Sequence, residues 1–213
     1  MPGVLEKLLD RMPPAWLRKI EVAMLMGAFA KAFDVEAPAL EDLTADEALA
    51  AFRAFTAACM EAALADEEVA AAYRASLGAE ARALGRKVRA AAPIGSEQAF
   101  LLVRFFYRGI GIELSGERQG AMVDERPDSF SCYPSGERPG AMADERPCDP
   151  STSQAIAVRF GPCSFSQRYT PEDCRFMSAF DEGFMCGIMG IEGDLRFECR
   201  LTEGAACCRA RLG

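Results

Sequence analysis

The chain has 213 residues, of which 50% are hydrophobic and 26% are charged, which suits one globular domain with a sizeable core, with or without a helical extension. Its net charge of -8 would repel a phosphate backbone, so nucleic-acid binding is not expected. Histidine is absent from the sequence, which excludes a Ser-His-Asp triad, a Cys-His pair and zinc bound through imidazole.

The beginning of the chain carries charges throughout and shows no apolar signal-peptide core. The most apolar early stretch, 22–33, is too short to span a bilayer and is interpreted as a buried helix. There are nine cysteines, an odd number, and all but Cys59 follow residue 130. Without an export signal, reduced thiols are expected rather than a disulfide framework. We therefore expect a soluble, cytoplasmic protein with no membrane partner.

The first 92 residues predict helices separated by short breaks. The expected helices span 4–12, 16–33, 45–64, 66–76 and 79–92. Thr44 and Glu47 are typical of a capping box at the start of the third of these, with Thr44 as the N-cap. Gly78 is interpreted as the stop between the last two. Thr56 falls on the apolar face of its helix, where its hydroxyl can bond the carbonyl four residues earlier.

A helix over 96–106 and a strand over 110–114 come next. Segment 115–127 then recurs as 135–147 with only two substitutions. The repeat is polar and rich in Gly and Pro, and two copies are too few for a solenoid. We interpret 115–153 as a flexible insertion, and the alternative is a lid or a partner-binding loop.

Regular structure is expected again from residue 155. The predicted elements are strands over 155–161, 194–200 and 206–212, and a helix over 171–188. Thr170 and Pro171 suit the N-cap and the first turn of that helix. The expected fold class is therefore α+β, with a helical region over 1–95 and an α+β module over 96–213. In this module a small, mostly antiparallel β-β-α-β-β sheet packs against one helix.

The helix predicted over 171–188 carries two acids in its middle, Asp181 and Glu182, in an apolar surrounding. Asp181 lies on the same side of this helix as Cys174 and Met177. A buried acid without a partner costs stability, so these acids are expected to have a role. The two alternatives are ion pairs with arginines of the following strands and binding of a ligand or substrate.

The cysteines after residue 160 are candidates for a site. Cys163 lies at the exit of a strand, and Cys174 lies in the first turn of the next helix. Cys207 and Cys208 point to opposite faces of the last strand, Cys208 to the apolar one. If the sulfur atoms converge, thiolates could hold a metal such as zinc or iron. The other interpretation is a small buried hydrophobic residue, which is preferred for Cys59, Cys186 and Cys199.

The C-terminal part holds a series of short motifs: Cys163-Ser-Phe-Ser166, Arg168-Tyr169, Pro171-Glu172 with Cys174, Asp181-Glu182-Gly183, Leu201-Thr202-Glu203-Gly204 and Cys207-Cys208. Together they resemble the L-2-amino-thiazoline-4-carboxylic acid hydrolase family and, more loosely, 4-vinyl-reductase-type ligand-binding domains. The resemblance implies an enzyme that opens a cyclic thiazoline and releases a cysteine derivative. It implies catalytic roles for Asp181, Glu182 and Glu203, with a carboxylate activating water. It also implies that Cys163, Cys174 and Cys207 hold a metal or contact a sulfur-containing ligand.

Three hypotheses follow. A hydrolase acting on a C–N bond of a thiazoline or amide predicts a concave pocket lined by the acids and by one or two cysteines. A non-enzymatic, sensor-like module that binds a ligand or a metal predicts a thiolate-lined site without a water-activating carboxylate. A structural or interaction protein predicts cysteines scattered through the core. A small molecule is the expected partner under the first two hypotheses, and formation of a homo-oligomer stays open.

Overall fold

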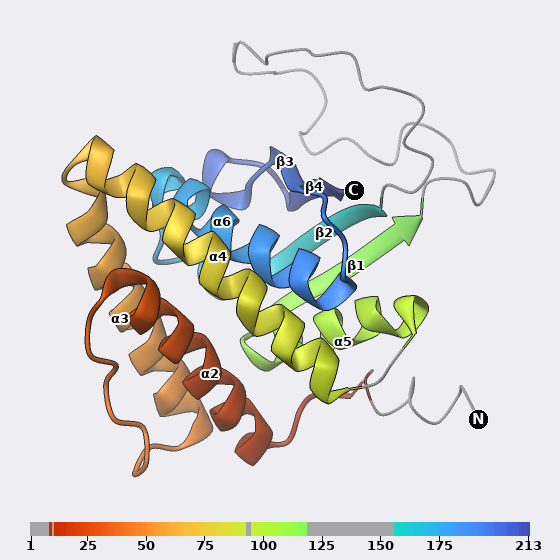
Figure 1. Ribbon diagram of the computed structural model, residues 1–213, viewed down its shortest axis with the longest axis horizontal. Coiled ribbons are helices and arrows are strands. Elements are labelled where there is room, and N and C mark those ends of the chain that lie inside the picture. The colour runs from red at the N-terminus through yellow and green to blue at the C-terminus, as the bar shows by residue number, and fades with distance from the viewer. Residues whose placement is uncertain (1–8, 10, 93–94, 119–155) are drawn as a thin grey trace.

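The computed structural model describes residues 9, 11–92, 95–118 and 156–213. In the described chain, five helices and a four-stranded antiparallel sheet confirm the predicted α+β class (Figure 1). The helices are α2 (Ala15–Phe33), α3 (Ala45–Leu64), α4 (Glu67–Ala91), α5 (Ser96–Gly109) and α6 (Pro171–Met189). The strands are β1 (Ile112–Arg118), β2 (Ile156–Cys163), β3 (Leu195–Cys199) and β4 (Cys208–Leu212), with a short 3-10 helix, η2 (Leu201–Glu203), between the last two.

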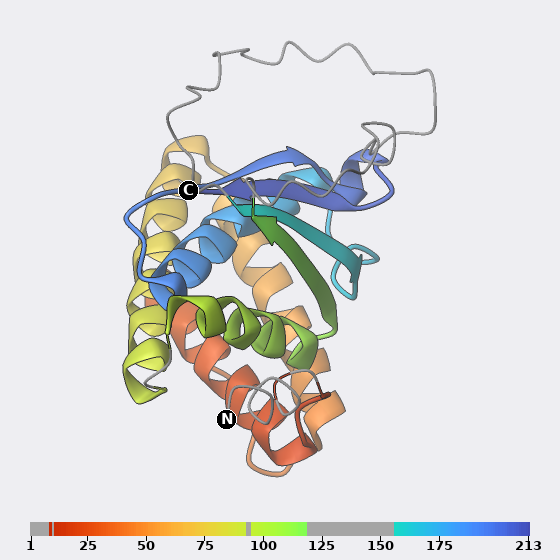
Figure 2. The ribbon, with the colours of Figure 1, turned by 90° about the vertical axis from the view of Figure 1, so that its right-hand side faces the viewer.

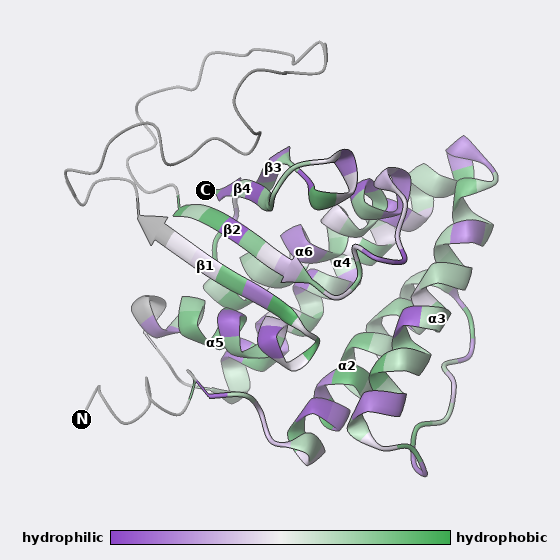
Figure 3. Ribbon diagram, turned by 180° about the vertical axis from the view of Figure 1, so that it is seen from behind, coloured by the Kyte–Doolittle hydropathy of each residue, from purple (hydrophilic) through white to green (hydrophobic). Residues whose placement is uncertain are grey.

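The sheet has the strand order β1-β2-β4-β3, and every neighbouring pair is antiparallel. Apolar and polar residues alternate along the first two strands, as expected for a sheet with one buried face (Figure 3). In β2, Val158 and Phe160 are buried and Arg159 between them is exposed. The register pairs Phe160 with Cys208 and Val158 with Ala210, so these residues share the inner face.

The inner face of the sheet covers α5 and α6, and the N-terminal helices complete the other side of the molecule (Figure 2). One continuous hydrophobic core runs from α2 and α3 through α6 to the sheet. Phe29 of α2 illustrates this continuity, because its ring contacts Phe52 of α3 and Phe180 of α6 at centroid distances of 5.7 and 5.2 Å. No gap in the packing therefore separates the helical region 1–95 from the α+β module 96–213, and the division of the chain into these two regions stays a prediction.

Two helices begin with the caps that the sequence predicts. Thr44 accepts a hydrogen bond from the backbone of Glu47, and the Glu47 carboxylate accepts one from the backbone of Thr44 at 2.8 Å. Thr170 and Asp173 form the same arrangement at the start of α6, where Pro171 occupies the first turn. The back-bond of Thr56 is confirmed as well, because its hydroxyl donates to the Phe52 carbonyl at 3.0 Å.

The predicted helix stop at Gly78 is wrong. The two expected helices form one helix, α4, which continues through this residue. Gly78 and Gly85 instead face α6, where Gly183 and Gly187 face back toward them. A Cβ atom at Gly85 or Gly183 would collide with a backbone carbonyl of the other helix, so the missing side chains allow the two backbones to touch. Glycine serves here for close approach between helices rather than as a C-cap.

The start of the predicted insertion also differs from the expectation. Strand β1 continues to Arg118, pairing Ser115 with Arg159 and Gly116 with Val158, so 115–118 belong to the sheet. Gly116 has no side chain that would collide with the ring of Phe100 in α5, which lets the strand pass over that helix. The remainder of the insertion, with Cys132 and Cys148, lies outside the described residues, as does most of the helix predicted over 4–12. None of the described helices is both long and apolar enough to cross a membrane.

Candidate functional site

A cavity of about 80 Å³ lies between the inner face of the sheet and the helices. This space exceeds that of a single water molecule, which takes roughly 10–15 Å³ on the same scale. Aromatic rings make up half of its lining: Phe52, Phe106, Tyr107, Phe160, Phe165, Tyr169, Phe180, Phe184 and Phe197. A few polar groups also face it, namely Asp181, Arg200 and three thiols. An apolar cavity with a few polar groups is the usual form of a small-molecule site.

Asp181 is the carboxyl group of this cavity. It lies two turns after Cys174 on α6, and both residues line the cavity as the helical spacing predicts. The hydroxyl of Tyr107, from α5, donates a hydrogen bond of 2.7 Å to its Oδ1 atom. Burial raises the pKa of Asp181 to about 7, and the Tyr107 hydrogen bond and the charge of Arg200 offset only part of this effect. This carboxyl group therefore changes its charge near neutral pH.

Arg200 supplies the positive charge of the cavity. It follows β3 directly, and its guanidinium lies over the Phe197 ring at 4.7 Å from the ring centroid. It donates a hydrogen bond of 3.1 Å to Ser178 Oγ of α6. Its Nε atom is buried and has no hydrogen-bond partner among the described residues. A bound molecule with an acceptor atom can satisfy that donor.

Three thiols line the cavity, those of Cys163, Cys174 and Cys208. Burial raises the pKa of the Cys174 thiol to about 11 and that of Cys208 to about 12, and it also raises that of Cys163. These groups are therefore neutral thiols at pH 7, which makes them poor nucleophiles. Within the described parts of the chain, no three Cys, Asp or Glu side chains are arranged to hold a metal ion. Metal binding at this site stays a prediction.

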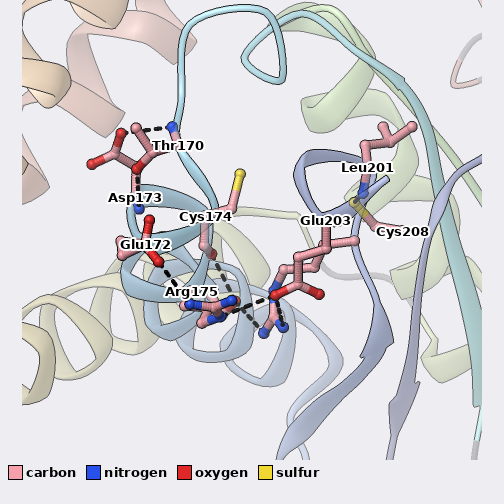
Figure 4. Close-up of polar contacts among 10 residues, drawn as sticks. Thr170, Glu172, Asp173, Cys174, Arg175, Leu201, Glu203 and Cys208 are labelled. Atoms are coloured by element: carbon pink, nitrogen blue, oxygen red, sulfur yellow. Dashed lines mark hydrogen bonds and ion pairs between the residues drawn. The ribbon is translucent and has the colours of Figure 1, made fainter. Parts of the chain in front are cut away.

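Cys207, one of the predicted ligands, does not line the cavity. It is buried in a separate small cluster with Cys199 and Ala205. The neighbouring Cys208 faces the cavity instead and accepts a hydrogen bond of 3.2 Å from the backbone of Leu201 (Figure 4). Successive residues of a strand point to opposite faces, so only one of the two thiols can enter the site.

Glu203, one of the predicted catalytic acids, lies outside the cavity. It is in η2, where its carboxylate pairs with the Nε atom of Arg175 at 3.0 Å (Figure 4). Arg175 also pairs with Glu172 at 3.1 Å, and Arg200 lies 3.7 Å from Glu203. The role of Glu203 in the described structure is that of an ion-pair partner between η2 and α6.

Glu182, the acid next to Asp181, also lies outside the cavity and faces a surface groove between α4 and α6. Burial raises its pKa, and the charge of Asp194 raises it further. Adjacent residues of a helix point about 100° apart, which explains why Asp181 and Glu182 serve different surfaces. Of the six predicted site residues, the structure thus gathers three in the cavity: Cys163, Cys174 and Asp181.

The structure adds two residues whose part in the site the sequence did not reveal. Tyr107 lies near the C-terminal end of α5. The feature that could have indicated a role in the site is the hydroxyl of Tyr107, a polar group on the buried side of α5. The sequence indicated Arg200 only as one of several possible ion-pair partners for the acids. Its guanidinium lies over Phe197 because the chain leaves β3 directly before this residue.

Comparison of the chain with protein-family models, with curated proteins and with solved structures finds no match. The resemblance to the thiazoline hydrolase family therefore stays a hypothesis that depends on the quoted motifs alone.

Proposed function

We propose that this protein binds a small, mainly apolar molecule in the cavity between its sheet and its helices. The observation that carries this proposal is an aromatic-lined space with polar groups concentrated around Asp181 and Arg200. The apolar walls would stabilise the body of the ligand, at roughly 25 cal/mol per Å² of apolar surface removed from water. Asp181 and the unpaired Nε atom of Arg200 would orient one polar group of the ligand.

The geometry favours binding over catalysis because only one of the three predicted catalytic acids faces the cavity. The thiols beside Asp181 are neutral, so none of them is ready to attack a substrate at neutral pH. The binding proposal keeps the cavity ligand and the predicted cytoplasmic location but not the predicted thiolate-lined site, because the thiols are neutral and Asp181 faces the cavity.

One observation favours a hydrolase as the second candidate. Asp181 has a pKa of about 7, so at neutral pH it is present in both its acid and its base form. A group with such a pKa is well suited to general acid-base catalysis. In this proposal the base form of Asp181 accepts a proton from a water molecule as the water oxygen bonds to ring carbon C2 of the thiazoline, and Arg200 stabilises the negative charge that develops. The ring C2–N bond then breaks, and the nitrogen takes up the proton held by Asp181 and leaves as the amine of an S-linked cysteine derivative.

Binding can be tested with 1-hexanol, which has an apolar body and a single hydroxyl, using two-dimensional NMR of the full chain. We expect shifts for amides around the cavity and saturable binding. Cys174→Leu extends a larger side chain into the cavity and should weaken binding by about tenfold, a loss of about 1.4 kcal/mol. Cys207→Ala is the matched control and should leave the affinity unchanged. Shifts scattered away from the cavity, or equal binding by Cys174→Leu, would contradict the proposal.

The hydrolase candidate can be tested by incubating the protein with L-2-amino-thiazoline-4-carboxylic acid and measuring the release of its α-amino group as the ring C–N bond is cleaved. We expect release to increase as the pH rises through about 7, because the base form of Asp181 is the active one. Asp181→Asn should abolish it, and Glu182→Gln should not. Release at the rate of the buffer blank would exclude this activity.

A further inference from the structure

Two arginines beside residues of the cavity wall, Arg53 and Arg168, make no ion pair or hydrogen bond through their guanidinium groups within the described residues. Arg53 follows the cavity-lining Phe52 in α3, and its guanidinium lies over the ring of Phe165, 5.4 Å from the ring centroid. The Nε atom of Arg53 is buried and has no partner. Arg168 is exposed in the turn between β2 and α6.

The charges of these two arginines act on each other. Burial lowers the pKa of Arg53, and the charge of Arg168 lowers it further. Asp46 has the opposite, smaller effect on Arg53, but its carboxylate is already paired with Arg18 at 3.0 Å. In a chain with a net charge of -8, the two arginines thus form a local excess of positive charge. Such an excess attracts an anion.

The arginine pair adjoins the cavity. Phe165 and Tyr169 belong to the cavity wall, and the same turn carries Arg168. Arg53 lies over the Phe165 ring and close to Gly111, which directly precedes β1, and the charges of Cys163 and Tyr169, both in the wall, influence it. A molecule that extends from the cavity past Phe165 would therefore meet the two guanidinium groups.

We propose that Arg53 and Arg168 form an anion-binding subsite at the Phe165 edge of the cavity, and that the ligand is an amphipathic acid whose anionic group binds there. This inference rests on the proposed ligand-binding function and adds the chemical class of the ligand. Guanidinium groups donate paired N–H bonds that match a carboxylate or a phosphate. The apolar part of the same molecule would lie among the aromatic rings inside the cavity.

The test compares hexanoate with 1-hexanol, which differ in the anionic group, by calorimetry on the full chain. We expect hexanoate to bind at least about tenfold more tightly than the alcohol at pH 7.5, as is typical for charge-assisted hydrogen bonds. The double variant Arg53→Gln/Arg168→Gln should bind both compounds equally. Arg86→Gln, which removes an exposed arginine of α4, is the matched control and should keep the preference for the acid.

Competition with inorganic phosphate tests whether the anionic group of hexanoate binds at the same place as a free anion. Phosphate should compete with hexanoate but not with 1-hexanol, because only the acid occupies the subsite. If the wild-type protein binds the two compounds equally, or if the double variant keeps the preference, the subsite is overturned while the cavity still binds ligands. If neither compound binds, the proposed function fails, and the inferred ligand class fails with it.

Discussion

At the scale of single residues, the buried acids decide how the protein responds to pH. Glu21 of α2 is only 1% exposed, and neither of its carboxylate oxygens has a hydrogen-bond partner among the described residues. Burial raises its pKa to about 8, and the charge of Arg18 offsets only part of this effect. The space beside it is tight, because a Cβ atom at Gly109 would collide with its carboxylate.

We expect the free energy of unfolding to fall as the pH rises from about 4.5 to about 8. In this range the unfolded chain has already lost the Glu21 proton while the folded chain keeps it. A rise in pH therefore lowers the free energy of the unfolded state relative to the folded state. Glu21→Gln, which stays neutral, should be more stable than the wild type at pH 8.5 by on the order of 3 kcal/mol in urea unfolding. The exposed Glu36→Gln is the control. Equal pH dependence in Glu21→Gln and the wild type would refute this assignment.

The hydrogen bond from Tyr107 to Asp181 has a measurable consequence of its own. It favours the charged form of Asp181 and thereby lowers its pKa against the larger effect of burial. In Tyr107→Phe we therefore expect the pKa of Asp181 to rise above its present value of about 7, as followed by NMR of the labelled carboxyl carbon. Tyr169→Phe, which removes the other buried hydroxyl of the cavity wall, should leave it unchanged. A pKa that stays constant in Tyr107→Phe would show that the bond is absent in solution.

At the scale of secondary-structure elements, the contact between α4 and α6 places the site. The glycines of the two helices bring their backbones together, and the opposite side of α6 then carries Cys174 and Asp181 into the cavity. A change that separates these helices would therefore disturb the site without touching any of its residues.

Two glycine substitutions with opposite effects test this contact. Gly183→Ala places a Cβ atom against the Gly78 carbonyl, so we expect a loss of about 1–3 kcal/mol in the free energy of unfolding. Gly27 lies on the exposed side of α2 with no atom near its Cβ position, and Gly27→Ala should stabilise the protein by about 0.5–1 kcal/mol. Both values can be read from urea unfolding. If Gly183→Ala proves as stable as Gly27→Ala, the helices are further apart than described.

At the scale of the whole molecule, one core joins the N-terminal helices to the sheet. The rings of Phe33 in α2 and Phe176 in α6, 5.9 Å apart, are one of several direct links across the predicted boundary near residue 95. A shared core of this kind leaves neither part with a complete interior of its own.

We therefore expect thermal unfolding in a single cooperative transition, with coincident curves from far-ultraviolet and near-ultraviolet circular dichroism. A fragment covering 96–213 should lack the near-ultraviolet signal of the full chain, because the face of α6 that packs against α4 would be open to water. Two separate transitions, or a fragment with native-like NMR shifts, would show instead that the two predicted regions are independent domains.

Local patterns in the sequence were enough to predict the helices α3 and α6, the caps that begin them and the α+β class. Capping and amphipathic periodicity are properties of neighbouring residues, so they are readable without a structure. The same periodicity predicted that Asp181 would lie on the same side of its helix as Cys174.

Only the tertiary structure decided which residues from distant segments meet. Gly78 is a helix stop by local rules, and it became a helix interior because α6 packs against it. Cys208 rather than Cys207 faces the cavity because the pairing of β4 with β2 determines which side of the strand is covered. Tyr107 of α5 donates a hydrogen bond to Asp181, and Arg200, which follows β3, lines the same cavity. Such long-range arrangements depend on the packing of whole elements, which no short stretch of sequence contains.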